Sequence, residues 1–226
     1  MSCAPTCWPC RDGVVPSATV RVGIDAHAVE GAPSGNGSYI RGLLPALARL
    51  DDDVEYVVYA LDPGHAFYAD FHAHPRVRVR RLWPRGALTR IPLALAAASW
   101  RDRLDALHVQ YVGPPYHRGA SVVTIHDLAF LRIPRAFPRL QSLRLRLQVR
   151  ANARRAAVVI TGSEHSKRDL VEAYGVDEPR LHVIPSPPTL GWPPCAIPRP
   201  SRQSGGRSTS PIVIFCPSAV STPART

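Results

Sequence analysis

The sequence predicts an α/β fold with a doubly wound, mostly parallel sheet of the Rossmann type. Two observations lead to this prediction. Short runs rich in β-branched residues alternate with longer segments whose apolar residues recur every three or four positions. The chain has 226 residues and is 45% hydrophobic, which is enough for a sizeable core. Strands that alternate with helices in this order pair in parallel, because each helix returns the chain to the same edge of the sheet.

In the first half of the chain, short β-branched runs predict the strands and a shared apolar face predicts the helices. Strands are expected over residues 20–25, 54–60 and 77–82. A helix is expected over residues 36–50, since its apolar residues at positions 40, 43, 44 and 47 lie on one face and Pro45 is compatible with a kink. A second helix is expected over residues 88–100.

The second half continues the same alternation. Strands are expected over residues 104–110, 121–125, 158–161 and 181–184. A helix over residues 140–155 is predicted to bury the face that carries Leu140, Leu143, Leu147 and Ala151. A last helix is predicted to begin at Ser163, which is a good N-cap, and to end at Gly175.

Composition divides the chain into three parts. Residues 1–19 form a leader rich in Cys and Pro, residues 20–185 carry the alternation, and residues 186–226 form a tail rich in Pro, Ser and Arg. Neither end can build a core, so we expect both termini to be disordered. The tail has no acidic residue, and we interpret it as the product of a frameshift or truncation near Ser186, with residues 186–226 out of frame.

Charge and cysteine content restrict the partners and the compartment. The formal net charge is +11, but Lys167 is the only lysine, a skew that is typical of GC-rich coding, so nucleic acid is not expected as a partner. All five cysteines lie outside residues 20–185, which favours a cytoplasmic protein. Cys7 and Cys10 have the spacing of a redox pair, and Cys3 could join them at a metal; the alternative is a disordered extension or a misassigned start of the chain. Neither a secretory signal nor a membrane span is expected.

The most specific stretch is SVVTIHDLAFL, residues 121–131. His126 and Asp127 follow directly after the β-branched run, so they lie where the strand ends at the edge of the sheet. Ligands of open α/β sheets bind at this edge. An imidazole there can donate or accept a hydrogen bond near neutral pH. We therefore expect His126 to contact a ligand, with a plain core histidine as the alternative; His108 is expected to be buried.

A glycine-rich turn follows the first strand. It runs from Gly31 to Tyr39 and includes Gly35, Asn36 and Gly37 at the start of the next helix. Backbone amides at a helix N-terminus can face an anion, and glycine lets a ligand approach them. The turn is not the GxGxxG fingerprint, and no acidic residue lies where a dinucleotide ribose requires one. The turn is therefore either a phosphate or sugar contact or a simple tight turn.

Two helix features have both structural and functional interpretations. Ser163 is explained by capping alone or by a place beside a ligand. Four arginines share one face of the helix at residues 140–155, at positions 139, 146, 150 and 154. That face is either solvated or attracted to an anionic membrane or acceptor.

Four ordered segments carry a resemblance to a known family. They are VRVGIDAHAVEGAPSGNGSYIRGLLPALARL, LDALHVQYVGPP, SVVTIHDLAFLRIPRAFP and VITGSEHSKRDLVEAYGVDEPRLHVIP. Together they resemble the N-terminal half of GT-B glycosyltransferases of the retaining family 4 group, over residues 20–185. In that group two Rossmann-like domains face each other across a cleft. The N-terminal domain mainly holds the acceptor, and the C-terminal domain holds the sugar nucleotide.

The resemblance also implies roles for residues. His126 would contact the transferred sugar and Asp127 would orient its loop, so these two are the predicted catalytic residues. Asp25, Gly35, Asn36, Gly37 and Ser163 are the predicted substrate-binding residues around the same cleft. The implied partners are a sugar nucleotide, which is a substrate rather than a cofactor, and a glycan or lipid-linked acceptor. No metal is expected.

The expected function is that of the acceptor-side domain of a glycosyltransferase at the cytoplasmic side, in solution or at the inner membrane face. Because residues 186–226 are too few for a donor-binding domain, we expect the chain to be inactive alone and to need a separate donor domain. Two alternatives stay open. One is a non-catalytic binding module, and the other is a nucleotide-binding α/β protein of another class, such as an oxidoreductase, although its fingerprint is missing.

Overall fold

The computed structural model describes residues 19–50, 53–133 and 138–185. The cysteine-containing leader up to residue 18 and the tail from residue 186 lie outside the described residues. The predictions made for those segments, including the frameshift near Ser186, therefore stay predictions. Among the described residues, no helix has the length and apolar character needed to cross a membrane.

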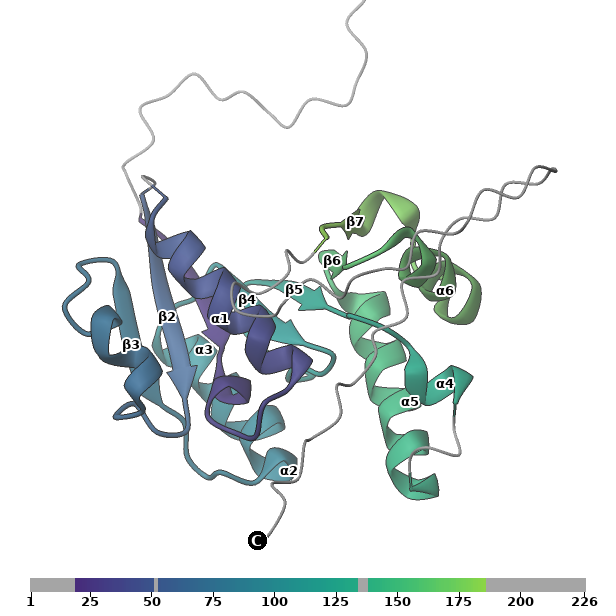
Figure 1. The fold of residues 1–226 in the computed structure, drawn as a ribbon, viewed down its shortest axis with the longest axis horizontal. Coiled ribbons are helices and arrows are strands. Elements are labelled where there is room, and N and C mark those ends of the chain that lie inside the picture. Colours follow the sequence, from purple (N-terminus) through teal and green to yellow (C-terminus); the bar gives the residue numbers. More distant parts are fainter. Residues whose placement is uncertain (1–18, 51–52, 134–137, 186–226) are drawn as a thin grey trace, which may run out of the picture. The chain divides into compact units, whose positions relative to one another are not determined.

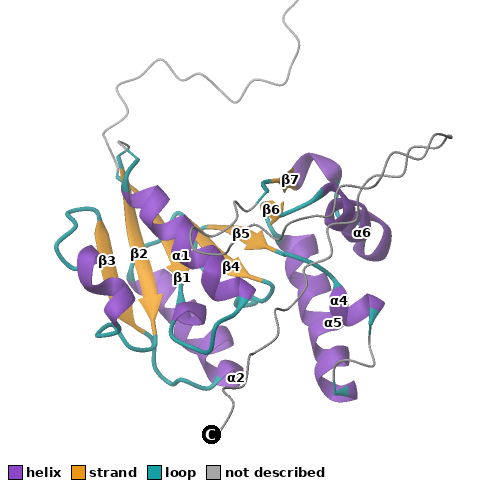
Figure 2. Ribbon diagram, in the orientation of Figure 1, coloured by secondary structure: helices purple, strands orange, loops and turns teal. Residues whose placement is uncertain are grey.

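A seven-stranded sheet forms the centre of the described structure (Figures 1 and 2). The strands are β1 (Val20–Asp25), β2 (Val54–Ala60), β3 (Val77–Arg81), β4 (Ala106–Gln110), β5 (Ala120–Thr124), β6 (Val158–Thr161) and β7 (Leu181–Val183). Their order is β3-β2-β1-β4-β5-β6-β7, and all six pairings are parallel. The predicted fold class and the seven predicted strands are confirmed.

Helices connect the strands. The longer ones are α1 (Gly35–Ala48), α5 (Arg139–Arg155) and α6 (Glu164–Tyr174). The expected helix at residues 88–100 is a succession of α2 (Ala87–Thr89), a π-helical stretch η3 (Arg90–Leu95) and α3 (Ala96–Arg101). Short elements that the sequence did not predict are η1 (His27–Val29), η2 (Ala66–Phe71), α4 (Ala129–Arg132) and η5 (Glu178–Arg180).

Both faces of the sheet are covered, as alternate residues of β2 show. Tyr56 and Val58 belong to one apolar cluster, which contains Ile40 and Leu44 of α1. Tyr59 belongs to a second cluster, which contains residues of α3, α5 and α6. Side chains alternate between the two faces of a strand, so α1 lies on one face of the sheet and α3, α5 and α6 lie on the other.

This arrangement places a topological switch point between β1 and β4. The chain leaves β1 toward β2 on one side and crosses to β4 on the other, so the connections diverge on opposite faces of the sheet. A crevice opens at the carboxyl ends of two such strands, and ligands of doubly wound folds bind there. Asp25 ends β1 and Gln110 ends β4, which puts both residues at this position.

The predicted orientation of α5 is wrong. Leu140, Leu143 and Leu147 are 80%, 55% and 61% exposed. The buried residues of α5 are Ser142, Val149, Asn152 and Ala153. At 100° per residue the two sets lie on opposite sides of the helix. Two of the buried residues are polar and have defined partners, since the Ser142 hydroxyl donates to the Phe130 carbonyl at 3.2 Å and Asn152 Oδ1 accepts from the Gly113 amide at 3.0 Å.

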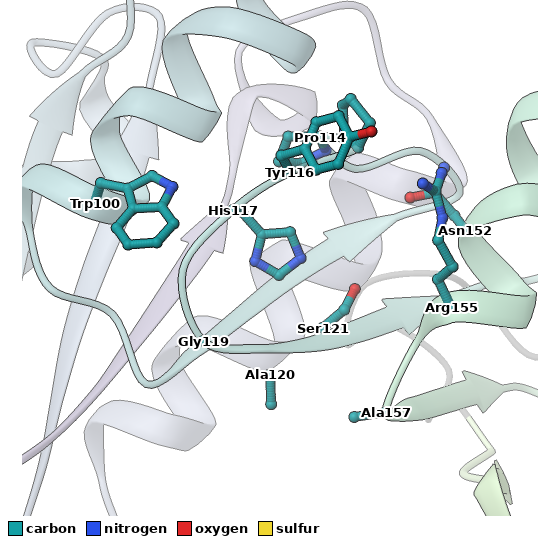
Figure 3. Close-up of a pocket in the computed structure, with 11 residues that line it drawn as sticks. Trp100, Pro114, Tyr116, His117, Gly119, Ala120, Ser121, Asn152, Arg155 and Ala157 are labelled. Carbon is teal, nitrogen blue, oxygen red and sulfur yellow. The ribbon is translucent and has the colours of Figure 1, made fainter.

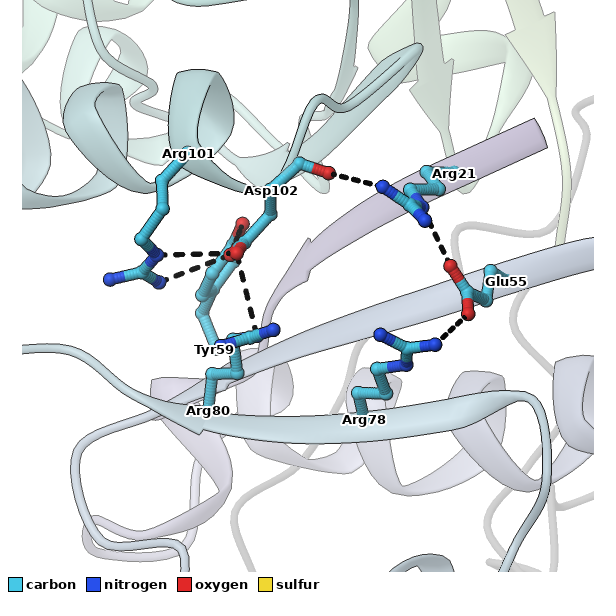
Figure 4. A network of polar contacts seen from close by, with 7 residues as sticks. All are labelled: Arg21, Glu55, Tyr59, Arg78, Arg80, Arg101 and Asp102. Atoms are coloured by element: carbon cyan, nitrogen blue, oxygen red, sulfur yellow. Dashed lines mark hydrogen bonds and ion pairs between the residues drawn. The ribbon is translucent and has the colours of Figure 1, made fainter. Parts of the chain in front are cut away.

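A charged network joins the end of α3 to the strands β1 to β3 (Figure 4). The buried Asp102 carboxylate accepts a hydrogen bond from the Tyr59 hydroxyl at 2.9 Å and pairs with Arg101 at 3.1 Å and Arg80 at 3.4 Å. Burial acts to raise the pKa of Asp102, but the bonds from Arg101 and Tyr59 prevail and the pKa lies below its usual value. Arg21 extends the network, since it donates to the Asp102 carbonyl and pairs with Glu55.

Candidate functional site

His126 lies at the exit of β5 and is held by a side chain from β4. Its Nε2 lies 2.9 Å from Gln110 Oε1, and Gln110 Nε2 donates to the Asn36 carbonyl at 3.2 Å. A carbonyl can only accept, so the amide nitrogen of Gln110 must face Asn36 and its oxygen must face His126. Gln110 Oε1 therefore accepts from His126 Nε2–H. The neutral ring carries its proton on Nε2 and leaves Nδ1 as an acceptor.

Aromatic rings surround the imidazole. The Tyr39 ring centroid is 5.0 Å from that of His126 in a T-shaped arrangement, and the Tyr111 ring centroid is 5.8 Å away in a tilted arrangement. Burial lowers the pKa of His126 more than the charge of Asp127 raises it. His126 is thus neutral at neutral pH, and it is only half-buried. A ligand that reaches it would meet a neutral acceptor beside two aromatic rings.

His108, on the neighbouring strand β4, is buried as the sequence predicts. Its Nε2 lies 2.8 Å from the Thr124 hydroxyl, and the Tyr39 hydroxyl lies 3.1 Å from the same oxygen. Burial lowers the pKa of His108 to about 4, so this imidazole is also neutral. Tyr39 of α1 thereby contacts both histidines and ties α1 to the carboxyl ends of β4 and β5.

Ser163 supports the loop after β5 indirectly, through Ser166. It caps α6, because its hydroxyl accepts from the Ser166 amide at 3.1 Å. The Ser166 hydroxyl donates to the backbone carbonyl of His126 at 3.0 Å. The capping interpretation of Ser163 is therefore correct, and the cap also fixes the residue that holds the backbone of His126.

Gly35 and Gly37 of the glycine-rich turn differ in the space around their Cα atoms. At Gly37 a Cβ atom would lie 2.7 Å from the Ala28 carbonyl oxygen, and the Gly37 amide already donates to the Ser34 hydroxyl at 3.1 Å. Gly37 therefore serves close packing. A Cβ at Gly35 would meet nothing within 4 Å. Gly35 and Asn36 stand in the first turn of α1, where the helix offers their amides no acceptor.

Asp25 is a buried carboxylate at the end of β1, beside this turn. His27 Nδ1 lies 2.7 Å from Asp25 Oδ1. Burial acts to raise the pKa of Asp25, but the hydrogen bond from His27 and the charges of His27 and Arg90 hold it below its usual value. Arg90 is itself only 4% exposed, and its Nε has no hydrogen-bond partner among the described residues.

Asp127 is exposed and stabilises the loop after β5. Its Oδ1 accepts from the Ala129 amide at 2.8 Å at the start of α4. Tyr111, on the facing loop, has a left-handed backbone with φ of 58°. Burial and the charge of Asp127 raise the pKa of the Tyr111 phenol. A non-glycine residue held in this conformation is uncommon, and such strain is found at ligand sites.

The structure brings His126 and the glycine-rich turn together, since Gln110 bridges Asn36 to His126. Ser163 joins them through Ser166, and Asp127 follows His126 directly. Sequence reasoning missed Gln110, although it ends a predicted strand and the rule that singled out His126 applies to it equally. It also missed Tyr39 and Thr124, whose contact joins residues 85 positions apart.

The larger of two hollows described in the structure lies elsewhere (Figure 3). Its volume is about 420 Å³, and Trp100, Tyr116, His117, Asn152 and Arg155 are among its lining residues. Residues 111–119, which connect β4 to β5, form no helix, and several of them line this hollow together with residues of α3 and α5. None of the predicted site residues lines it. Among residues 19–50, 53–133 and 138–185, no cluster of side chains suits a metal ion.

Comparison with solved structures gives matches of low identity. Anabaena Alr3699/HepE, solved in complex with UDP and glucose, is 20% identical, with a TM-score of 0.47 over 74% of this chain and 44% of that one. Sucrose-phosphate synthase from Thermosynechococcus elongatus is 17% identical, with a TM-score of 0.45 over 75% of this chain and 90% of that one. A glycosyltransferase from Rickettsia africae is 12% identical, with a TM-score of 0.46 over 74% and 43%.

The chain thus spans less than half the length of Anabaena Alr3699/HepE. No curated protein matches the sequence. The profile of Glycosyltransferase Family 4 matches residues 33–187, which is well over half of the chain. The match contains α1, His126 and Ser163, and it agrees with the resemblance of the four sequence segments. The chain therefore belongs to glycosyltransferase family 4.

Proposed function

We propose that residues 20–185 are the acceptor-side domain of an enzyme that moves a sugar from a sugar nucleotide to a glycan or lipid-linked acceptor. One observation carries the proposal. At the switch point of the sheet, Gln110 and Ser166 hold His126 from two sides, and its Nδ1 remains an acceptor on a half-buried ring. The imidazole is held through Nε2, and its Nδ1 has no hydrogen-bond partner among the described residues and can accept a hydrogen bond from a ligand.

The roles of the residues follow from their chemistry. Neutral His126 accepts a hydrogen bond from a sugar hydroxyl at Nδ1. The amides of Gly35 and Asn36 at the N-terminus of α1 face the diphosphate of the donor, because a helix N-terminus carries about half a positive charge. Asp127 keeps the loop after β5 in place through Ala129. Ser163 positions His126 through Ser166, and Asp25 with His27 forms the floor beside the turn.

Transfer also requires the donor to be held in line with the acceptor. Orientation of two reactants contributes about 7–11 kcal/mol to the lowering of a barrier. The described domain forms one wall of such a cleft, and the proposal places the sugar nucleotide mainly on a second, donor-binding domain. The 226-residue chain alone is therefore expected to transfer no sugar, and no metal or cofactor takes part in the contacts proposed here.

The test is a transfer assay. The purified chain is incubated with UDP-, GDP- and ADP-sugars and with glycan and polyprenyl phosphate acceptors, alone and with a donor-binding domain of family 4 added in trans. The expected result is no product from the chain alone and product in the mixture. His126→Ala should abolish that product, while His72→Ala, a change of an exposed histidine away from the site, should not.

Two results would contradict the proposal. Turnover by the chain alone would remove the need for a second domain. Binding of acceptor at His126 without transfer in any mixture would favour the non-catalytic binding module. Because the test measures product and binding separately, the two outcomes are distinguishable.

A further inference from the structure

The outward face of α5 is apolar where solvent should favour polar residues. Leu140, Leu143 and Leu147 lie along one side of the helix, and all three are more than half exposed. Ile133, just before α5 in the described structure, is 60% exposed. Scattered exposed leucines are ordinary, but three in consecutive turns of one helix form a stripe.

Arginines flank this stripe. The sequence of α5 is RLQSLRLRLQVRANARR, with six arginines and no acidic residue. Arg139 and Arg146, with Ser142 and Leu143, line a hollow of about 180 Å³. The Nε of Arg146 is buried and has no hydrogen-bond partner among the described residues. Two arginines that line one hollow offer the positive charge that a phosphate requires.

The first turn of α5 also lacks the negative charge that usually stabilises a helix N-terminus. It contains Arg139 and no acidic residue. A cation near a helix N-terminus is unfavourable, because the helix dipole is positive there. An anion bound between Arg139 and Arg146 would remove this repulsion. Departures from local rules without compensation within the fold are expected at functional sites.

Charge decides between the partners that could cover the stripe. A second copy of the chain, docked through the same face about a two-fold axis, would bring arginines against arginines. An interfacial helix has the observed pattern, with leucines on one side and arginines beside them. Anionic lipid headgroups supply both the negative charge and the apolar layer beneath it.

We propose that α5 docks this domain on a bilayer that contains anionic phospholipids. The helix lies in the plane of the interface. Leu140, Leu143 and Leu147 enter the acyl boundary, and a lipid phosphate occupies the hollow between Arg139 and Arg146. The proposal is independent of sugar transfer, since it concerns a surface that shares no residue with the His126 site.

The test is co-sedimentation of the 226-residue chain with vesicles. Phosphatidylcholine vesicles are compared with vesicles that also contain phosphatidylglycerol, at low and high salt. The chain should bind the anionic vesicles, and added salt should weaken the binding. The double change Leu143→Gln and Leu147→Gln should lower the partition coefficient about tenfold or more. Leu88→Gln with Leu93→Gln removes two leucines that are 69% and 65% exposed elsewhere, and it should change nothing.

A second pair of variants controls for the net charge of +11. Arg139→Gln with Arg146→Gln should weaken binding to anionic vesicles by about 25-fold, at about fivefold for each arginine. Arg49→Gln with Arg168→Gln removes the same charge from exposed positions outside α5 and should have a much smaller effect. Equal thermal midpoints of all variants show that each remains folded.

Three results would overturn the proposal. They are equal binding to both kinds of vesicle, equal losses in the α5 and control arginine pairs, and an absence of vesicle binding by the folded chain. The last result, with the leucines of α5 protected from solvent in hydrogen exchange, would indicate that a protein segment covers the stripe.

Discussion

Two polar networks of this domain differ in whether all their polar atoms have partners within the fold. In the Asp102 network, one buried carboxylate has Tyr59, Arg80 and Arg101 as partners, so the charge is satisfied within the fold. In the His126 network, Gln110 Oε1 accepts a hydrogen bond from Nε2–H, and Nδ1 remains an acceptor on a half-buried ring. The first network joins α3 to the sheet, and the second stands at the switch point. A closed network indicates a structural role, whereas an open one indicates a place for a ligand.

The largest effect on stability is expected from the closed network. Asp102→Ala removes three partners and leaves the buried Tyr59 hydroxyl without an acceptor, so the free energy of unfolding should fall by about 3 kcal/mol. Arg101→Gln should cost less than about 1 kcal/mol, because the Arg101 side chain is 56% exposed. Urea denaturation measures both. A smaller loss for Asp102→Ala than for Arg101→Gln would show that the network does not stabilise the fold.

A comparable effect is expected at Gly37. Gly37→Ala places a methyl group 2.7 Å from a backbone oxygen that cannot move freely, which should lower the free energy of unfolding by about 2 kcal/mol. Gly35→Ala meets open space and should change stability by less than about 0.5 kcal/mol. If Gly35→Ala were the more destabilising change, the packing described for the turn would be wrong.

Histidine burial predicts a dependence of stability on pH. The pKa of His108 is about 4 in the folded state and about 6.5 in the unfolded chain. Between these values only the unfolded state binds the proton, so stability falls as the pH falls, by about 2 kcal/mol from pH 7 to pH 5. His108→Gln should remove most of this slope in urea titrations at several pH values. An unchanged slope would assign the protonation to other groups.

The open network should contribute less to stability than the closed network. His126→Ala should lower the free energy of unfolding by about 1 kcal/mol, because the ring is half-buried and makes one side-chain hydrogen bond. Gln110→Leu should leave the fold intact but release the ring, so that NMR detects both neutral tautomers of His126 instead of the Nε2–H form. A single Nδ1–H form in the unchanged protein would contradict the hydrogen-bond assignment.

Much of the fold could be predicted from local signals. β-branched runs located the strands, and the positions after β5 and β6 located His126 and Ser163. The buried side of α5 could not be predicted from apolar periodicity, because Ser142 and Asn152 find hydrogen-bond partners in other elements while the leucines face outward. Tyr39 was missed for a related reason, since its contact with Thr124 depends on how α1 packs across the sheet.

The most direct test of the central claim is to map ligand contacts by NMR on the 226-residue chain. UDP-glucose and methyl glucoside are titrated separately while amide and imidazole shifts are followed. We expect the shifts to concentrate at Gly35, Asn36, Gln110 and His126, and we expect His126→Ala to reduce the shifts that the sugar causes. Shifts that concentrate instead at Trp100 and Tyr116, in the hollow between α3 and α5, would contradict this expectation.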